Sequence, residues 1–215
     1  MNTIPFVHPY HTVILANGDF PKHPVPLSYL NNCSRIICCD GATEALTGYG
    51  FQPDYIVGDL DSLPLELQQK YSHLLQHDSG QDTNDLTKAV RFCKERKWDE
   101  ITILGATGKR EDHSVGNISL LADYAGYVRV QMITDHGVFV PLLQSGRFES
   151  CAGQQVSVFS VTADTLYSFH GLKYPVAEQA LPMWWQGTLN EAIAQEFTIE
   201  MNHGKALVFR EHVKI

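Results

Sequence analysis

Up to about residue 135, short apolar runs rich in β-branched residues alternate with stretches whose apolar positions recur at helical spacing. The pattern predicts strands at residues 12–16, 35–39, 55–57, 74–77, 100–104 and 128–133. It predicts helices at residues 41–49, 63–71, 84–96 and 113–124. Strands that alternate with helices indicate an α/β fold, with a mostly parallel sheet flanked by helices.

After residue 135 the pattern changes. Short strands are predicted at residues 146–150, 156–161, 165–170, 197–201 and 206–209, and Gly, Asp and Asn turns separate them. Many short strands joined by turns are typical of a small β-sandwich or barrel. We therefore expect two domains, an α/β domain over residues 1–135 and a smaller C-terminal β-sandwich domain over residues 136–215.

Polar loops follow five of the predicted strands of the α/β domain. They lie at residues 17–19, 40–41, 58–62, 78–85 and 105–113. The carboxyl ends of parallel strands share one edge of a sheet, and ligands of such sheets bind outside that edge. The five loops are therefore expected to form one site.

The loop at residues 58–62 carries two carboxylates, Asp59 and Asp61, directly after an apolar strand that ends near Gly58. Side chains alternate with period two along a strand, so two acids one residue apart can point the same way. Such close like charges repel each other unless a cation or hydrogen-bond donors lie between them. The pair is either part of a solvated turn or a cation site.

The next loop gathers Gln81, Asp82 and Asp85 before a helix that also carries Lys88 one turn later. Asp82 or Thr83 can cap this helix, and acidic groups are stabilising at a helix N-terminus. Capping accounts for one of these acids. It does not account for three polar groups and a lysine gathered at the edge of the sheet.

The fifth loop combines glycine with positive charge. Gly105 and Gly108 allow a close backbone approach, and Lys109 and Arg110 could face a phosphate chain. The loop is not a Walker A motif, because that motif needs glycine at Ile103 and Ser or Thr at Arg110. An ordinary turn between a strand and a helix, with solvated charges, remains the alternative for this segment.

The composition of the chain excludes several classes of protein. The 215 residues are 44% hydrophobic and 19% charged, as in a globular protein, and the net charge of −8 argues against nucleic-acid binding. No apolar run is long enough to span a bilayer, and the first residues do not read as a signal peptide. The five cysteines form no CxxC pair, which indicates reduced thiols and a cytoplasmic location. The ten histidines are scattered without the spacing of metal ligands, which disfavours a zinc site.

The order and spacing of these loops are similar to those of the thiamine pyrophosphokinase family, and the similarity continues into the C-terminal half. The matching segments are residues 40–41, 53–54, 58–62, 81–85 with Lys88, 105–117, 168–176 and 187–192. The chain departs from the family pattern at two positions. Lys109 stands where a second glycine commonly precedes the arginine, and Leu189 stands where serine commonly precedes Asn190.

The resemblance implies an enzyme that transfers the diphosphate of ATP to the hydroxyl of thiamine, giving thiamine diphosphate and AMP. It also implies Mg²⁺ as cofactor and a homodimer with sites between subunits, in which the β-sandwich serves thiamine binding and dimerisation. Two alternatives stay open. One is another Mg²⁺-dependent transferase that uses nucleotides, and the other is a non-catalytic module that binds a nucleotide or thiamine.

The resemblance also assigns roles to residues of the predicted site. The metal ligands would be Asp40, Asp59 and Asp61. The catalytic residues would be Asp59, Asp61, Asp85 and Arg110. The ATP contacts would be Asp40, Gly41, Lys88, Gly105, Gly108, Arg110 and Asp112. The thiamine contacts would be Gln81, Asp82, Asp85, Trp184, Trp185 and Asn190. Given this resemblance, one of Trp184 and Trp185 is expected to contact thiamine or the dimer interface. The pair lies between Pro182 and Gly187, as in a loop, and an exposed indole can stack on flat cationic rings.

Overall fold

The alternation of strands and helices is present in the computed structural model, which describes residues 3–213. Its main division falls between Asp135 and His136 and separates two compact units. The segment that ends at His8 and the segment Leu121–Gly126 belong to the C-terminal unit rather than to the N-terminal one.

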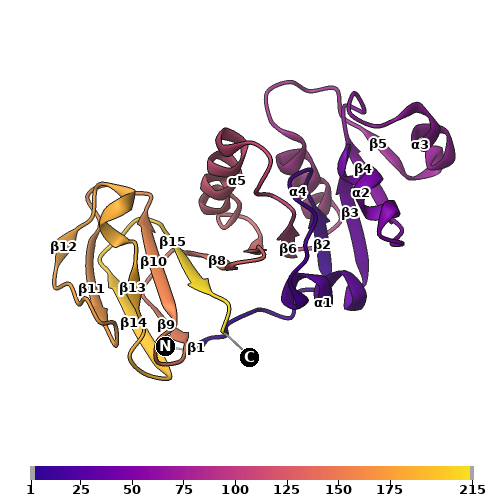
Figure 1. Cartoon of the computed structure of the whole chain (residues 1–215). Helices are drawn as coiled ribbons and strands as arrows, with labels where there is room; N and C mark the ends of the chain where they lie inside the picture. The colour runs from indigo at the N-terminus through magenta and orange to yellow at the C-terminus, as the bar shows by residue number, and fades with distance from the viewer. Residues whose placement is uncertain (1–2, 214–215) are drawn as a thin grey trace. The chain divides into compact units, whose positions relative to one another are not determined.

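The N-terminal unit is built on six parallel strands (Figure 1). The strands are β2 (Thr12–Leu15), β3 (Arg35–Cys39), β4 (Tyr55–Gly58), β5 (Leu75–His77), β6 (Glu100–Leu104) and β7 (Arg129–Ile133). Within this unit they lie in the order β7-β6-β2-β3-β4-β5, and every neighbouring pair is parallel. The central strand β2 is buried along its whole length, as expected for a sheet covered on both faces.

Helices connect these strands, and their bounds are α1 (Pro24–Asn32), α2 (Ala42–Gly48), α3 (Leu65–Lys70), α4 (Asp85–Glu95) and α5 (Glu111–Tyr124). Every predicted strand and helix of this half is present, with ends that differ by no more than two residues. Helix α1 was not predicted, and it begins with two prolines. Pro24 and Pro26 fall in the first turn, where a missing N–H costs nothing, and His23 accepts a hydrogen bond from the backbone N–H of Val25 at 3.2 Å.

Helix α4 places the predicted site residues against the sheet. Its apolar side, with Leu86, Ala89 and Val90 buried, packs on β3 and β4. The prediction that Asp82 or Thr83 caps this helix was wrong. Asn84 is the cap, and its side-chain oxygen accepts hydrogen bonds from the Thr87 N–H at 3.0 Å and the Thr87 hydroxyl at 2.8 Å.

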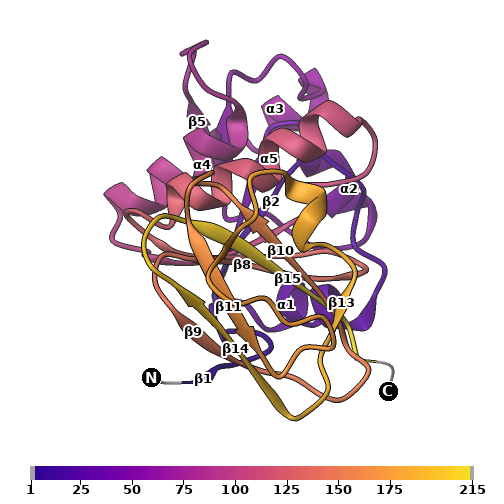
Figure 2. The ribbon, with the colours of Figure 1, turned by 90° about the vertical axis from the view of Figure 1, so that its left-hand side faces the viewer.

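The C-terminal unit contains two groups of strands (Figure 2). One group has the order β13-β10-β15-β8 and the other β1-β9-β14-β11-β12. Their bounds are β1 (Thr3–Ile4), β8 (Gly137–Leu142), β9 (Gly146–Glu149), β10 (Gln155–Ser160), β11 (Leu166–His170), β12 (Gln179–Ala180), β13 (Asn190–Glu191), β14 (Glu196–Met201) and β15 (Ala206–Glu211). All pairs within the two groups are antiparallel except β1 with β9.

A shared core lies between the two groups and makes this unit the predicted β-sandwich. Val156 and Val208 from the first group and Phe148, Tyr167 and Phe197 from the second are all buried in it. The rings of Phe148 and Phe197 stack with centroids 5.0 Å apart. Strand β8 was not predicted, because five of its six residues are buried without alternation and it contains a proline.

Arg210 is a charged residue inside this core, with no exposed surface. Its guanidinium donates hydrogen bonds to the carbonyl oxygens of Glu149 and Pro5 at 2.8 Å and of Phe6 at 3.2 Å. Burial lowers the pKa of Arg210 to about 10. The arginine thus fastens the N-terminal segment to the β-sandwich.

Among the helices of residues 3–213, none has both the length and the hydropathy needed to cross a membrane.

Candidate active site

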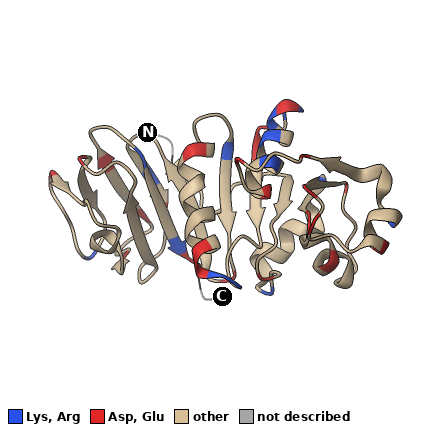
Figure 3. Ribbon diagram, turned by 90° about the horizontal axis from the view of Figure 1, so that it is seen from above, with Lys and Arg blue, Asp and Glu red and all other residues tan. Residues whose placement is uncertain are grey.

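The end of β3 and the loops after β2, β4, β5 and β6 border a pocket of about 450 Å³ in the N-terminal unit. Acidic and basic residues both line it, and Figure 3 colours the acidic positions of the ribbon red and the basic positions blue. The lining residues are Ala16, Asn17, Gly18, Cys39, Asp59, Ser62, Gln81, Thr83, Asn84, Asp85, Leu86, Lys88, Ala106, Gly108, Lys109, Arg110, His113, Ser114 and Asn117. The predicted gathering of polar loops at one edge of the sheet is therefore present.

Three carboxylates converge beside this pocket. One oxygen from each of Asp40, Asp59 and Asp61 lies within 4.8 Å of the other two. Asp40 follows β3 and is buried, whereas the other two lie in the loop after β4. The strand ends at Gly58, so strand alternation is not what aims Asp59 and Asp61. Between them Leu60 has φ of 68°, and this left-handed residue turns the chain so that Asp59 accepts a hydrogen bond from the Asp61 N–H at 3.3 Å.

Asp40 is the buried member of the carboxylate cluster. Its Oδ2 accepts a hydrogen bond from the Ser62 N–H at 3.3 Å, but its buried Oδ1 has no hydrogen-bond partner among residues 3–213. Burial raises the pKa of Asp40 to about 6, and the charges of Asp85, Asp61 and Asp59 act in the same direction. A buried carboxylate oxygen without a partner is the feature expected of a cation ligand.

The cluster fits Mg²⁺. This ion prefers carboxylate oxygens and usually retains several water molecules, so two or three acids at the rim of a pocket are sufficient. Asp40, Asp59 and Asp61 are therefore the residues that could hold the ion.

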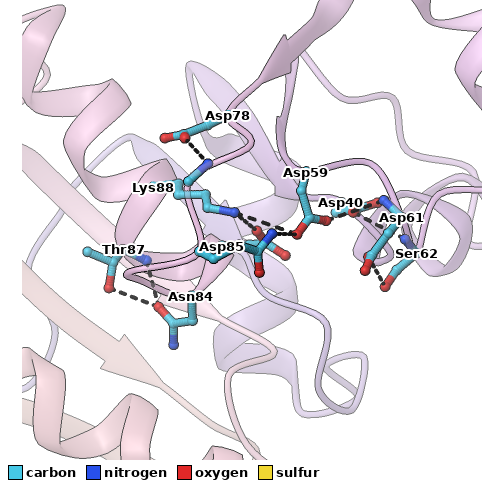
Figure 4. A network of polar contacts seen from close by, with 11 residues as sticks. Asp40, Asp59, Asp61, Ser62, Asp78, Asn84, Asp85, Thr87 and Lys88 are labelled. Carbon is cyan, nitrogen blue, oxygen red and sulfur yellow. Dashed lines mark hydrogen bonds and ion pairs between the residues drawn. The ribbon is translucent and has the colours of Figure 1, made fainter.

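Lys88 lies on the other side of Asp59 and is buried despite its charge (Figure 4). Its ammonium is 3.0 Å from Oδ1 of Asp85 and 3.8 Å from Oδ2 of Asp59. Burial lowers the pKa of Lys88, but the hydrogen bond and charge of Asp85, together with Asp59, outweigh this and raise it. The pKa of Asp59 is lowered by the Asp61 N–H, with Gln81 and Lys88 contributing in the same direction.

The absence of a side chain at Gly58 allows this packing. A Cβ there would lie 2.8 Å from the Cβ of Asp40 and 3.3 Å from Oδ1 of Asp85. The acids of β3 and α4 therefore meet over the end of β4. Gln81 completes the group, since its amide donates a hydrogen bond to Oδ2 of Asp59 at 3.3 Å.

The loop after β6 is shaped by two left-handed glycines. Gly105 has φ of 62° and Gly108 has φ of 84°. A Cβ at Gly108 would lie 2.3 Å from a carboxylate oxygen of Asp19, so only glycine allows the loop to pack there. Next to it, Arg110 donates two hydrogen bonds to Asp112, one from Nε at 3.0 Å. This pair is exposed, and the hydrogen bond from Arg110 lowers the pKa of Asp112 to about 2.

Three asparagines of the pocket were given no individual role from the sequence, although Asn17 and Asn84 lie in loops that were predicted to form the site. Asn84 donates a hydrogen bond to Oδ1 of Asn117 at 3.0 Å, and Asn117 donates to the carbonyl of Ala106 at 2.9 Å. This chain of amides links the cap of α4 to the loop after β6. Asn17 follows β2 and lies against Gly41, where a Cβ would be 2.4 Å from its amide nitrogen. A polar residue after a predicted strand was the available signal for Asn17, and no periodic pattern marks Asn117.

Four predicted thiamine contacts are not among the residues that line this pocket. Asp82 is exposed and does not line the pocket. Trp184 and Trp185 belong to the C-terminal unit, in the short 3₁₀ helix η2 (Trp184–Gly187). Trp184 is half-buried with its ring 5.7 Å from that of Phe159, whereas Trp185 is 71% exposed. Asn190, in the same unit, is buried and uses its amide to hold the backbone of a neighbouring loop.

Comparisons with known proteins agree across both units. The sequence profile described as "Thiamin pyrophosphokinase, catalytic domain" matches residues 27–133, and the profile described as "Thiamin pyrophosphokinase, substrate-binding domain" matches residues 137–209. Thiamine pyrophosphokinase 1 of Oryza sativa subsp. japonica is 36% identical over 149 residues, which are 58% of this chain and 56% of the relative. Thiamine pyrophosphokinase of Bacillus subtilis is 32% identical over 114 residues, or 50% of this chain and 52% of the relative. In both alignments the chain spans about half the length of the relative.

Solved structures show the same fold. The crystal structure of thiamine pyrophosphokinase from Bacillus subtilis superposes with a TM-score of 0.77 at 23% identity, covering 94% of this chain and 99% of that one. Thiamin pyrophosphokinase from Candida albicans gives a TM-score of 0.77 at 19% identity, covering 95% and 90%. Because the two matched profiles together account for most of the sequence and describe the two halves of one kind of protein, the chain belongs to the thiamin pyrophosphokinase family.

Proposed function

We propose that this protein transfers the terminal diphosphate of ATP to the hydroxyl of thiamine, and that the products are thiamine diphosphate and AMP. Membership of the family supports this activity. The observation that carries the proposal is the convergence of Asp40, Asp59 and Asp61 within 4.8 Å beside a pocket that also contains Lys109 and Arg110. Acidic metal ligands next to phosphate-facing cations are what diphosphate transfer requires.

In this reaction the thiamine oxygen forms a bond to the β-phosphorus of ATP, and the bond from that phosphorus to the α,β-bridging oxygen breaks. AMP leaves with the bridging oxygen, and the hydroxyl proton is lost. Mg²⁺ bound by Asp40, Asp59 and Asp61 would neutralise phosphate charge and polarise the phosphorus–oxygen bonds. Lys88 keeps Asp59 and Asp85 in place by its ion pairs, so these acids stay oriented when substrates bind. Arg110 would turn from Asp112 towards the phosphates, where its planar fork suits their oxygens.

Thiamine is the second substrate in this proposal. Its thiazolium ring is a permanent cation, and Asp85 and Gln81 would supply a negatively polarised side of the pocket. Trp185 is the candidate platform for its rings, because an exposed indole can stack on them and attract their charge.

We also propose a homodimer. Met183, Trp185 and Leu189 are all large apolar side chains and more than half exposed, although they lie within a few residues of one another. Covering such residues is a common role of a subunit interface. Five unpaired thiols, of which Cys38, Cys39 and Cys93 are buried, support a reducing compartment, the cytoplasm.

Product identification tests the function. The protein is incubated with ATP, Mg²⁺ and thiamine, and the products are identified by mass spectrometry and phosphorus NMR. AMP and thiamine diphosphate in equal amounts are expected, and EDTA or the Asp59→Asn variant should stop their formation. ADP with thiamine monophosphate would instead indicate a simple kinase. Binding of ATP or thiamine without turnover would indicate a non-catalytic module.

A further inference from the structure

Three cations line the pocket, and two of them are already neutralised. Lys88 is paired with Asp85 and Asp59, and Arg110 is paired with Asp112. Lys109 differs from both. Within residues 3–213 no carboxylate lies at ion-pair distance from its ammonium, which instead donates a hydrogen bond to Oδ1 of Asn17 at 2.9 Å. A neutral amide therefore holds a full positive charge in the pocket of an acidic protein.

The backbone at Lys109 is unfavourable for a lysine. Its φ is 41°, in the left-handed region that glycine adopts readily and residues with side chains seldom adopt. The conformation explains why glycine would suit this position. Here the strained residue carries a side chain that reaches across to a second loop, the loop after β2.

Asn17 is held in the orientation that this contact needs. Its amide nitrogen lies against Gly41, where a Cβ would be only 2.4 Å away. The amide oxygen is thus turned towards the ammonium of Lys109. One of the three N–H donors of that ammonium is used by Asn17, and the lysine is exposed, so two donors remain for an anion.

We propose that Lys109, oriented by Asn17, binds the phosphate chain of the nucleotide and determines how tightly this protein holds it. The inference rests on the proposed function only in taking a nucleotide polyphosphate as the ligand. It assigns to this chain a cationic contact that a glycine at the same position cannot make. The contact adds to Arg110 and does not depend on the carboxylate cluster.

Binding measurements test the contact without turnover. Affinities for ATP and for inorganic tripolyphosphate are measured by calorimetry with Mg²⁺ and without thiamine, for the parent and for Lys109→Gly and Lys109→Met. Both variants should bind both probes about tenfold more weakly, the effect of losing one charge-assisted hydrogen bond. Asn17→Ala should show a smaller loss of about threefold, because the charge stays but is no longer oriented.

Lys97 provides a matched control. It is also an exposed lysine with a left-handed backbone, at φ of 62°, but it follows α4 and does not line the pocket. Like Lys109→Gly, Lys97→Gly removes one positive charge and one left-handed residue with a side chain, so both glycine variants should melt no lower than the parent. Lys97→Gly should bind ATP and tripolyphosphate within twofold of the parent.

Several outcomes would overturn the inference. They are parental affinity in Lys109→Gly, an equal loss in Lys97→Gly, and failure of the parent to bind either probe. Failure of the proposed function gives a different result. A parent protein that binds ATP but forms no thiamine diphosphate would refute the activity, and the comparison of Lys109 with Lys97 would still decide the contact.

Discussion

Replacing Asp40 by asparagine should make the metal-free protein more stable and the enzyme inactive. Asp40 is almost fully buried, its Oδ1 has no hydrogen-bond partner among the described residues, and three other acids surround it. These features favour the protonated carboxyl in the folded state and raise its pKa from 3.8 to about 6. Metal binding needs the negative charge of Asp40, but the folded protein without metal disfavours that charge.

The size of the effect follows from the pKa. A rise from 3.8 to about 6 corresponds to about 3 kcal/mol of unfavourable free energy for the carboxylate in the folded protein. The new amide of Asp40→Asn also has to be accommodated, which costs about 1–2 kcal/mol. A net gain of about 1–2 kcal/mol in the free energy of unfolding is expected at pH 7.5 in EDTA.

The stability of the parent protein should depend on pH, in the direction that the raised pKa of Asp40 sets. Because the folded-state pKa is raised, the stability that Asp40 contributes in its protonated form is fully present below pH 3.8 and is lost as the pH rises through about 6. At pH 5 the parent regains about 1.4 kcal/mol of this contribution relative to pH 7.5. The advantage of Asp40→Asn should shrink by that amount, since asparagine does not titrate.

Urea unfolding at pH 5 and pH 7.5 measures these differences, with EDTA and with excess Mg²⁺. Mg²⁺ should stabilise the parent by mass action and leave Asp40→Asn unchanged, so the order of stability reverses when metal is added. The reasoning would be refuted by a variant that is less stable than the parent in EDTA at pH 7.5. An advantage that does not change between the two pH values would refute it equally.

Three further predictions concern the carboxylates, the phosphate loop and the C-terminal unit. Asp61→Asn should lower turnover about 10²-fold and leave the melting temperature unchanged. It should also weaken Mn²⁺ binding, which electron paramagnetic resonance measures. Near-normal turnover at limiting Mg²⁺ would contradict the role of Asp61 as a metal ligand. Arg110→Ala should lower kcat by about 10²-fold with little change in the KM for thiamine, because the exposed guanidinium, paired here with Asp112, would turn to the phosphates and not to thiamine. Steady-state kinetics in which only that KM changes would reverse the assignment. Trp184→Ala should lower the free energy of unfolding by about 1–2 kcal/mol, because the ring of Trp184 packs on Phe159. Trp185 is exposed, so Trp185→Ala should raise the KM for thiamine at unchanged stability. Full activity of Trp185→Ala would exclude Trp185 as the platform for the thiamine rings.

The sequence by itself determined the elements of the N-terminal unit, because their signal is local. Apolar runs and helical spacing are properties of adjacent residues, and they placed ten strands and helices of that unit within two residues of their ends. The same signal failed at two elements that contain proline. Helix α1 has two prolines in its first turn, where no backbone hydrogen bond is lost, and β8 contains a proline in a strand that is buried without alternation.

The sequence also determined that polar loops would meet at one edge of the sheet, since parallel strands place their carboxyl ends together. Only the tertiary structure decided how the side chains pair there. Lys109 reaches Asn17 across 92 positions of the chain, and Ser62 donates its N–H to Asp40 across 22. Such pairs depend on the exact packing of loops, which left-handed residues such as Leu60 redirect. No periodicity records these distances, because loop packing is set by contacts between segments that the chain order keeps far apart.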